Sequence, residues 1–459
     1  MSTLYILFII ISTVIILLIQ VLYLKINPFI ALLISAIYVG ILAGMPLDTI
    51  MDSVKNGMGG ILGFVATVVG LGAIFGQLLE SSGGAESLAQ HLTKKFGKEN
   101  SSWAMMITGF LVSIPVFLDV GFIILVPIVY ALARDTKKSL LYYGIPLLAG
   151  MAVTHSFIPP TPGPIAVASI INVQLGWVII FGFLLGIPTA IIAGPLFGKY
   201  ISKRIFLKPP ENFVAKEAIE FEGESERDHS RKLPSFLSIA VIIGIPLFLI
   251  LLNTFTDLVV EKGLIRKSLI TDILIFIGHP FSALIIATLI AIYFLGIRRG
   301  FSRQKILDLS TKALGPAGII ILITGAGGVL KQMLIDSGIG EIMAQSIAGS
   351  SLPPILLAWI LAAIIRITQG SATVAMVTAA GIIAPVVTLL DLSDPQRALI
   401  VIAIASGATV LSHVNDSGFW LVGKYFGMNE KQTLQSWTVM ETIIGVCGLI
   451  FTLIAGLFV

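Results

Sequence analysis

The stretch Gly150–Pro164 reads GMAVTHSFIPPTPGP and lies inside a long apolar segment. It contains four prolines, and a proline removes a backbone donor and breaks the hydrogen-bond ladder of a helix. Broken backbone at membrane depth is stable only where protein or a water-filled cavity satisfies its polar groups. A second interrupted segment, Ser406–Gly418 (SGATVLSHVNDSG), lies in the other half of the chain. Paired interruptions of this kind mark the place where a membrane protein built from repeats holds its ligand.

The composition is typical of a membrane protein. Of 459 residues, 56% are hydrophobic and 12% are charged, whereas a soluble surface needs far more charge. Many apolar runs reach the roughly 20 residues that cross a bilayer as a helix, so we predict an all-α polytopic membrane protein surrounded by lipid. The basic residues fall in short loops, where they set topology, so the net charge of +4 does not indicate nucleic-acid binding. Cys447 is the only cysteine, which excludes an intramolecular disulfide.

The first half of the chain, residues 1–200, is predicted to hold a re-entrant hairpin and a broken helix. Segment 102–133 is too long for one plain helix, and its middle contains a proline, a glycine and Asp119. These residues suggest a hairpin whose tip lies at membrane depth. Basic residues flank the hairpin on both sides, so both of its ends are expected on the cytoplasmic side. The broken helix that follows covers 139–173.

The second half, residues 234–459, is predicted to repeat this plan. Segment 201–233, which joins the halves, mixes basic and acidic residues and is interpreted as a cytoplasmic linker. A second hairpin is expected over 353–388, with a polar middle around Arg366, and a second broken helix over 397–425. Acidic residues flank this second hairpin, so it is expected to enter the membrane from outside.

Residue identities support a repeat between the halves. The stretches LGAIFGQLLESSGGAESLAQ and AGGVLKQMLIDSGIGEIMAQ pair Gln77 with Gln332 and Gln90 with Gln345, both at an offset of 255 positions. The charge pattern then predicts two inverted-topology repeats, with both termini outside. The alternative is chance similarity between glycine-rich apolar helices.

The sequence also predicts the position or length of three further helical segments. The amphipathic stretch 46–55 is expected to lie at the membrane surface, and the amphipathic stretch 302–312, which lies among basic residues, is expected on the cytoplasmic side. Each is followed by a glycine-rich span. Segment 273–295 is expected to form one span.

Ionisable side chains at membrane depth are costly and rare, so each is a functional candidate. The candidates in the hairpins and broken helices are Asp119, His155, Arg366, His413 and Asp416. Arginine stays charged, and its planar fork can hold a carboxylate through two hydrogen bonds, so Arg366 is the favoured anion-binding residue. The alternative is a purely structural ion pair of Arg366 with Asp416 or Asp119.

Asp119 and Asp416, together with His155, are the candidate proton carriers. Burial favours the protonated form of a carboxyl and a nearby arginine favours the ionised form, so local geometry can poise either acid to exchange protons. Histidine titrates near neutral pH. Each candidate also has a structural alternative: the acids can cap hairpin tips and helix ends, and the histidines can bond a neighbouring carbonyl.

Half-helix N-termini carry free N–H groups and partial positive charge, which suit an anion. The polar side chains and glycines at the breaks fit a small hydroxylated anion better than an apolar substrate. The predicted substrate-binding residues are Thr154, His155, Ser156, Thr161, Gly163, Arg366, Gln369, Gly370, Ser371, His413, Asn415 and Ser417.

Several classes of protein find no support in the sequence. No ligand spacing indicates a metal, no Walker A motif indicates ATP-driven pumping, and no GxSxG element indicates a hydrolase. We therefore expect neither an enzyme nor a bound cofactor.

Four blocks resemble the gluconate permease family and together, in order, extend the resemblance over nearly the whole chain. They read IPVFLDVGFIILVPIVYALA, GIPLLAGMAVTHSFIPPTPGP, RITQGSATVAMVTAAGIIAP and SGATVLSHVNDSGFWLVGKYFGM. The resemblance implies proton-coupled uptake of sugar acids across a bacterial inner membrane; some members of the family take idonate, glycerate or D-serine. Two positions depart from the family pattern, which often has His where Thr161 stands and Gly where Ser156 stands.

The family belongs to a larger ion-transporter superfamily, and this kinship implies a dimeric scaffold and a transport domain that moves as an elevator. The alternatives are a sodium-coupled carboxylate carrier and a passive anion channel. A dicarboxylate carrier should need a second fixed positive charge at the site, and only Arg366 is found.

Overall fold

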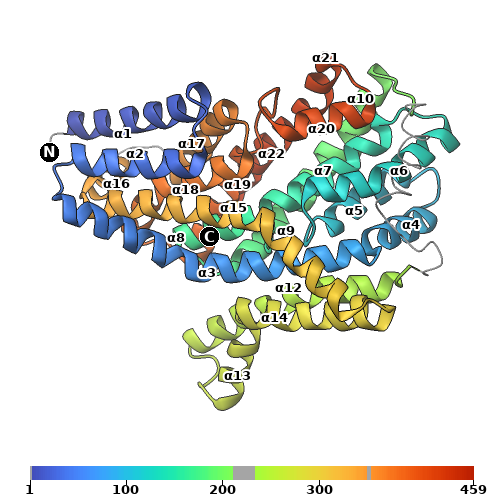
Figure 1. The fold of residues 1–459 in the computed structure, drawn as a ribbon, viewed down its shortest axis with the longest axis horizontal. Helices are drawn as coiled ribbons and strands as arrows, with labels where there is room; N and C mark the ends of the chain where they lie inside the picture. Colours follow the sequence, from blue (N-terminus) through green and yellow to red (C-terminus); the bar gives the residue numbers. More distant parts are fainter. Residues whose placement is uncertain (1–2, 210–232, 349–352) are drawn as a thin grey trace.

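The computed structural model describes residues 3–209, 233–348 and 353–459, and every regular element in these ranges is a helix (Figure 1). Within them, eight helical segments are long and apolar enough to cross a membrane. The predicted all-α polytopic membrane architecture is therefore confirmed. Most of the predicted linker, 210–232, lies outside the described residues.

Two long helices, α3 (Leu47–Ser81) and α15 (Arg303–Asp336), pack against each other through the middle of the molecule (Figure 1). At their contact Gly57 lies against the backbone of Gly328, and a Cβ on either glycine would meet the other helix. Small residues of this kind let two membrane helices approach closely. Helices α1 (Thr3–Leu18) and α2 (Pro28–Leu42) lie beside one end of this pair.

The expectation that 46–55 and 302–312 are separate from the spans that follow them was wrong, because both stretches are continuous with α3 and α15. Their position relative to the membrane stays a prediction. No proline interrupts α3. Pro316 lies within α15, where the helix continues on both sides of it. Neither amphipathic stretch therefore contains a break that would end its helix.

After α3 the chain forms a series of shorter helices that include two interruptions. These are α4 (Gly84–Phe96), α5 (Ser101–Val112), α6 (Leu118–Thr136), α7 (Leu141–Phe157), α8 (Pro162–Ile171), α9 (Leu175–Ile191), the π-helix η2 (Ile192–Leu196) and α10 (Phe197–Arg204). We call residues 113–117, between α5 and α6, tip 1, and residues 158–161, between α7 and α8, break 1. The peptide bond between Pro159 and Pro160 is cis.

The helices after α15 are arranged along the chain in the same order as the helices after α3. They are α16 (Ile339–Ala348), α17 (Pro354–Gln369), α18 (Ala372–Leu389), α19 (Asp394–Gly407), α20 (Ser417–Phe426), α21 (Glu430–Thr433), the π-helix η5 (Leu434–Thr438) and α22 (Val439–Ala455). We call residues 370–371 tip 2 and residues 408–416 break 2. Helix α20 begins and ends 255 positions after α8, the offset found in the sequence. The inverted orientation of the two halves stays a prediction.

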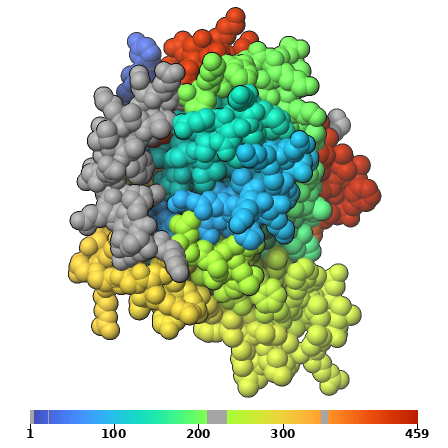
Figure 2. Space-filling view, turned by 90° about the vertical axis from the view of Figure 1, so that its right-hand side faces the viewer, coloured from blue at the N-terminus to red at the C-terminus, as the bar shows by residue number. Residues whose placement is uncertain are grey.

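Between the two series lie α12 (Phe236–Glu261), α13 (Leu269–Gly278), α14 (Pro280–Ala291), the π-helix η3 (Ile292–Gly296) and the 3-10 helix η4 (Ile297–Arg299). The single span expected over 273–295 is divided, because His279 ends α13 and caps α14, whose first residue is a proline. Figures 1 and 2 both show α13 projecting from the body of the molecule.

Two glycines of α3 allow the backbone of tip 1 and of break 1 to pack directly against this helix. A Cβ at Gly76 would collide with the carbonyl of Pro115 in tip 1, and one at Gly72 would touch the carbonyl of Pro160 in break 1. By contrast, a Cβ at Gly63 on the same helix would meet nothing. The close approach of the irregular backbone to α3 therefore depends on Gly76 in particular.

We expect Gly76→Ala to destabilise the protein by about 1–3 kcal/mol, because the added methyl overpacks a contact made by backbone, which cannot swing aside. The measurement is the melting temperature of detergent-purified protein. Gly63→Ala is the matched control and should leave that temperature unchanged or raise it slightly. Equal melting of the two variants would show that α3 and tip 1 do not pack as described.

Candidate functional site

A cavity of about 370 Å³ lies where the start of α6 and the end of α7 face tip 2 and break 2. Its walls come from the start of α6, the last turns of α7 and α17, tip 2, the start of α18, the end of break 2, the start of α20, and the η5–α22 segment. The lining residues are Leu118, Asp119, Ala152, His155, Ser156, Arg366, Gln369, Gly370, Ser371, Ala372, Thr373, Asn415, Asp416, Ser417, Gly418, Trp437 and Glu441.

Three helices present their N-termini to this cavity. Its lining includes Leu118 at the start of α6, Ala372 at the start of α18 and Ser417 at the start of α20. The first N–H groups of a helix have no partner within the helix, and the macrodipole places partial positive charge there. Three converging N-termini give the cavity a preference for anions.

Arg366 is buried in the last turn of α17, with 3% of its side chain exposed. One guanidinium nitrogen donates to Asp416 Oδ2 and another donates to the carbonyl oxygen of Gly370. Asp416 also accepts from the Ser412 hydroxyl and, through Oδ1, from the Gly418 N–H at 3.1 Å, which caps α20. Trp437 Nε1 donates to Ser412 Oγ at 2.7 Å. The ion pair thus joins the end of α17 to break 2, and the bond to Gly370 fixes tip 2 beside them.

Further contacts hold the end of α17 and tip 2 against break 2. The His413 Nε2 atom lies 2.8 Å from the carbonyl oxygen of Ile367, and Asn415 Nδ2 donates to the same oxygen at 3.0 Å. These contacts satisfy a carbonyl that the end of α17 leaves without a helical partner. Gly370 has φ +79°, and a Cβ there would collide with the backbone of Asn415, so only glycine fits this place.

Several buried polar atoms around the cavity have no hydrogen-bond partner within the described residues. They include Arg366 Nε, His155 Nδ1 and both amide atoms of Gln369. Buried polar groups in native proteins are normally paired, so unpaired ones need a partner from solvent or a ligand. A hydroxylated anion supplies both acceptors and donors for these atoms.

Most of the predicted site residues, ten in all, line the large cavity. Those that line it are Asp119, His155, Ser156, Arg366, Gln369, Gly370, Ser371, Asn415, Asp416 and Ser417. Thr154, Thr161, Gly163 and His413 are not among the residues that line it. The Thr161 hydroxyl donates to the carbonyl of Ile158 at 2.6 Å, and Gly163 allows close approach of Met376 from α18.

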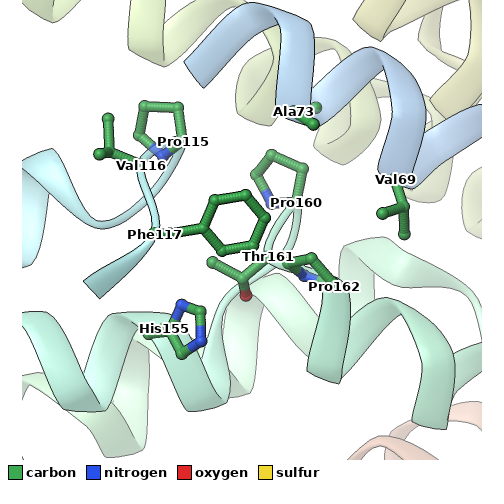
Figure 3. Close-up of a pocket in the computed structure, with 10 residues that line it drawn as sticks. Val69, Ala73, Pro115, Val116, Phe117, His155, Pro160, Thr161 and Pro162 are labelled. Carbon is green, nitrogen blue, oxygen red and sulfur yellow. The ribbon is translucent and has the colours of Figure 1, made fainter. Parts of the chain in front are cut away.

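A second, much smaller cavity of about 10 Å³ lies between α3, tip 1 and break 1 (Figure 3). Figure 3 shows Phe117 of tip 1 beside Thr161 and Pro160, with Ala73 of α3 above them. His155 lines this cavity as well as the large one, and its ring centre lies 6.2 Å from that of Phe117. The imidazole therefore stands between the two cavities.

The sequence profile of the GntP family permeases matches residues 4–458. The chain belongs to this family. It is 44% identical to a gluconate permease of Pseudomonas aeruginosa over 94% of this chain and 93% of that protein. It is 40% identical to the low-affinity gluconate transporter of Escherichia coli over 99% of each chain, and 38% identical to the L-idonate transporter of the Gnt-II system of that organism over 93% of each.

Among solved structures, the YdaH transporter of Alcanivorax borkumensis shares the fold of the permease with a TM-score of 0.64. The superposition covers 93% of this chain and 97% of that one at 12% sequence identity, so the likeness concerns the fold alone. The expectation that the protein is a membrane permease and not an enzyme is confirmed by its family.

Sequence reasoning missed Glu441 and Trp437, both of which line the large cavity of the permease. Glu441 lies in α22 and has 4% of its side chain exposed. Of all described residues, Arg366 and Glu441 are the only charged ones that are buried. A single acidic residue inside the apolar final span was the signal that would have revealed it.

No group of three or more His, Cys, Asp or Glu side chains in the described ranges is arranged to hold a metal ion.

We expect Asp416→Asn to destabilise the permease by about 3–5 kcal/mol, because it leaves the buried Arg366 guanidinium without its counter-ion. The change is measured as a loss of thermal stability in detergent. The control is Asp135→Asn, which removes the partner of Lys98 in a pair whose side chains are 72% and 61% exposed. Its effect should stay within about 1 kcal/mol. Similar losses in both variants would contradict a structural role for the buried pair.

Proposed function

We propose that this permease is a secondary active transporter that takes up a small sugar acid, such as gluconate, together with protons. The observation that carries the proposal is the large cavity, in which one buried arginine, three helix N-termini and unpaired polar side chains face the same space. Its relatives are named for gluconate and L-idonate, which are hydroxylated monocarboxylates. The cavity volume falls in the range of about 300–1,000 Å³ that is usual for small-molecule sites.

In this proposal the substrate carboxylate lies near Arg366 and the helix N-termini. Arg366 has an N–H at Nε that carries no hydrogen bond within the described residues, and a small turn of this buried side chain toward the cavity would let it donate to an anion while the ion pair with Asp416 persists. The substrate hydroxyls then meet the amide of Gln369 and the hydroxyls of Ser371 and Ser156, which line the same cavity. Both ends of a hydroxylated acid therefore find groups of suitable chemistry.

Proton coupling follows from the acids around the site. Asp119 is exposed to the cavity and accepts no hydrogen bond within the described residues, so a proton can reach it without breaking a contact. Asp416 accepts three hydrogen bonds, which protonation would weaken. We therefore assign proton exchange to Asp119, with His155 beside it in the cavity lining, and a counter-ion role to Asp416.

We further propose that the two halves are inverted repeats, with both termini outside the bacterial inner membrane, and that the protein works as a dimer. Helices α3 and α15, with α1 and α2, would form the scaffold, and the two tips and breaks would belong to a moving transport domain. The glycines of α3 that face Pro115 and Pro160 support this division, because a smooth helix surface permits irregular backbone to slide along it.

The test is uptake of radiolabelled gluconate into proteoliposomes that contain the purified permease. We expect saturable accumulation when the interior is made alkaline, in buffers free of sodium, and loss of accumulation when a protonophore collapses the gradient. Uptake that does not depend on the pH gradient and requires sodium would identify a sodium-coupled carrier. Uptake that does not saturate and never exceeds equilibrium would identify a channel.

Arg366→Lys tests the contribution of this arginine to gluconate binding in the same assay. Lysine keeps the positive charge but lacks the planar fork, so half-saturation should require roughly tenfold or more gluconate, a loss of the order of one charge-assisted hydrogen bond. Arg298→Lys alters an exposed arginine and should leave the kinetics unchanged. Unchanged kinetics in both variants would remove Arg366 from the binding site.

A further inference from the structure

The two buried charged side chains of the described residues, Arg366 and Glu441, line one cavity but do not pair with each other. Arg366 is committed to Asp416 and to the carbonyl of Gly370. The carboxyl of Glu441 makes no hydrogen bond or ion pair with any described residue, although it interacts electrostatically with Arg366 and Asp416. An unpaired carboxylate removed from water is costly, whereas the protonated acid is a neutral hydrogen-bond donor.

The charged and titratable groups that face Glu441 come from a few elements. They are Arg366 from α17, Asp416 from break 2, His155 from α7 and Asp119 from α6. The other elements packed on α22 add none nearby: α9, η2 and η5 contain no titratable residue, and the charged residues of α19 lie in its first turn. That turn is about 15 Å from the end of α19 that adjoins α22.

The balance of charge around the cavity limits when an anion can bind. If every acid were ionised, one arginine would face the three carboxylates of Asp119, Asp416 and Glu441. A further carboxylate brought into this space would be repelled, and repulsion is strong where water is scarce. A proton on Glu441 removes the charge that lies deepest. Protonation of Glu441 and binding of an anion then favour each other, and this linkage is reciprocal.

We propose that Glu441 is a proton-binding residue of the permease, which takes up one proton when the anionic substrate binds and releases it when the substrate leaves. The inference rests on the proposed function and adds to it a residue that shares the proton exchange with Asp119. The step is a simple protonation: one carboxylate oxygen of Glu441 accepts a proton from water in the cavity, and the same O–H bond breaks on release. Asp416 keeps its charge throughout, because it is the counter-ion of Arg366.

The test compares wild type, Glu441→Gln and Glu430→Gln, a matched control on α21 whose side chain is exposed. Gluconate is added to purified protein in weakly buffered solution, and a pH-indicator dye reports proton uptake per gluconate bound. We expect the uptake to fall by about one proton in Glu441→Gln only, since glutamine mimics the protonated acid. In wild type, one linked proton should weaken gluconate binding about tenfold for each pH unit above neutrality. Glu441→Gln should lose this pH dependence.

Glu441→Asp keeps an ionisable group and should restore both proton uptake and the pH dependence. Wild-type proton uptake and pH dependence in Glu441→Gln would overturn the role of Glu441 while leaving proton-coupled transport intact. Loss of gluconate binding by Glu441→Gln at low pH would also overturn it, because the neutral side chain should bind as the protonated acid does. Binding by wild type without any proton uptake would instead refute the proposed function itself.

Discussion

The ion pair between Arg366 and Asp416 is the contact on which the arrangement of the cavity depends. The two residues are 50 positions apart: Arg366 lies in the last turn of α17, just before tip 2, and Asp416 is the last residue of break 2. A buried guanidinium needs a counter-ion and hydrogen-bond acceptors, and here Asp416 and the carbonyl of Gly370 provide them. Because Asp416 also caps α20, the same contact sets where that helix begins and which N–H groups face the cavity.

The two series of helices contribute unequally to this site. The last turn of α17 carries the arginine, break 2 carries its counter-ion, and tip 2 and break 2 lead into the starts of α18 and α20. Tip 1 and break 1 pack on the glycines of α3, and from this series Asp119, His155 and Ser156 reach the cavity. The second series thus supplies the ion pair and Glu441, and the first supplies Asp119 and His155, which the proposed mechanism uses for proton exchange together with Glu441. In the proposed function, these unequal contributions allow the site to bind an anion and to couple its transport to protons.

The sequence alone was sufficient to predict the helical membrane fold and most of the cavity, because charges and prolines inside apolar segments are conspicuous. Arg366, Asp416 and His155 were found in this way. The contact of His413 with the Ile367 carbonyl depends on two residues 46 positions apart, which no local pattern reveals. Glu441 was overlooked because its span has no break, and only packing shows which side of α22 faces the cavity. The continuity of α3 was likewise hidden, since an amphipathic stretch can end a membrane helix or extend it.

The most direct test of the account is an experimental structure of the permease determined with gluconate bound. The account predicts gluconate inside the large cavity, with its carboxylate about 3 Å from a nitrogen of Arg366 or from the first N–H groups of α18 and α20. The Arg366–Asp416 pair should be intact in that structure. Gluconate bound elsewhere, or bound in the cavity without contact to Arg366 or these helix ends, would contradict the central claim.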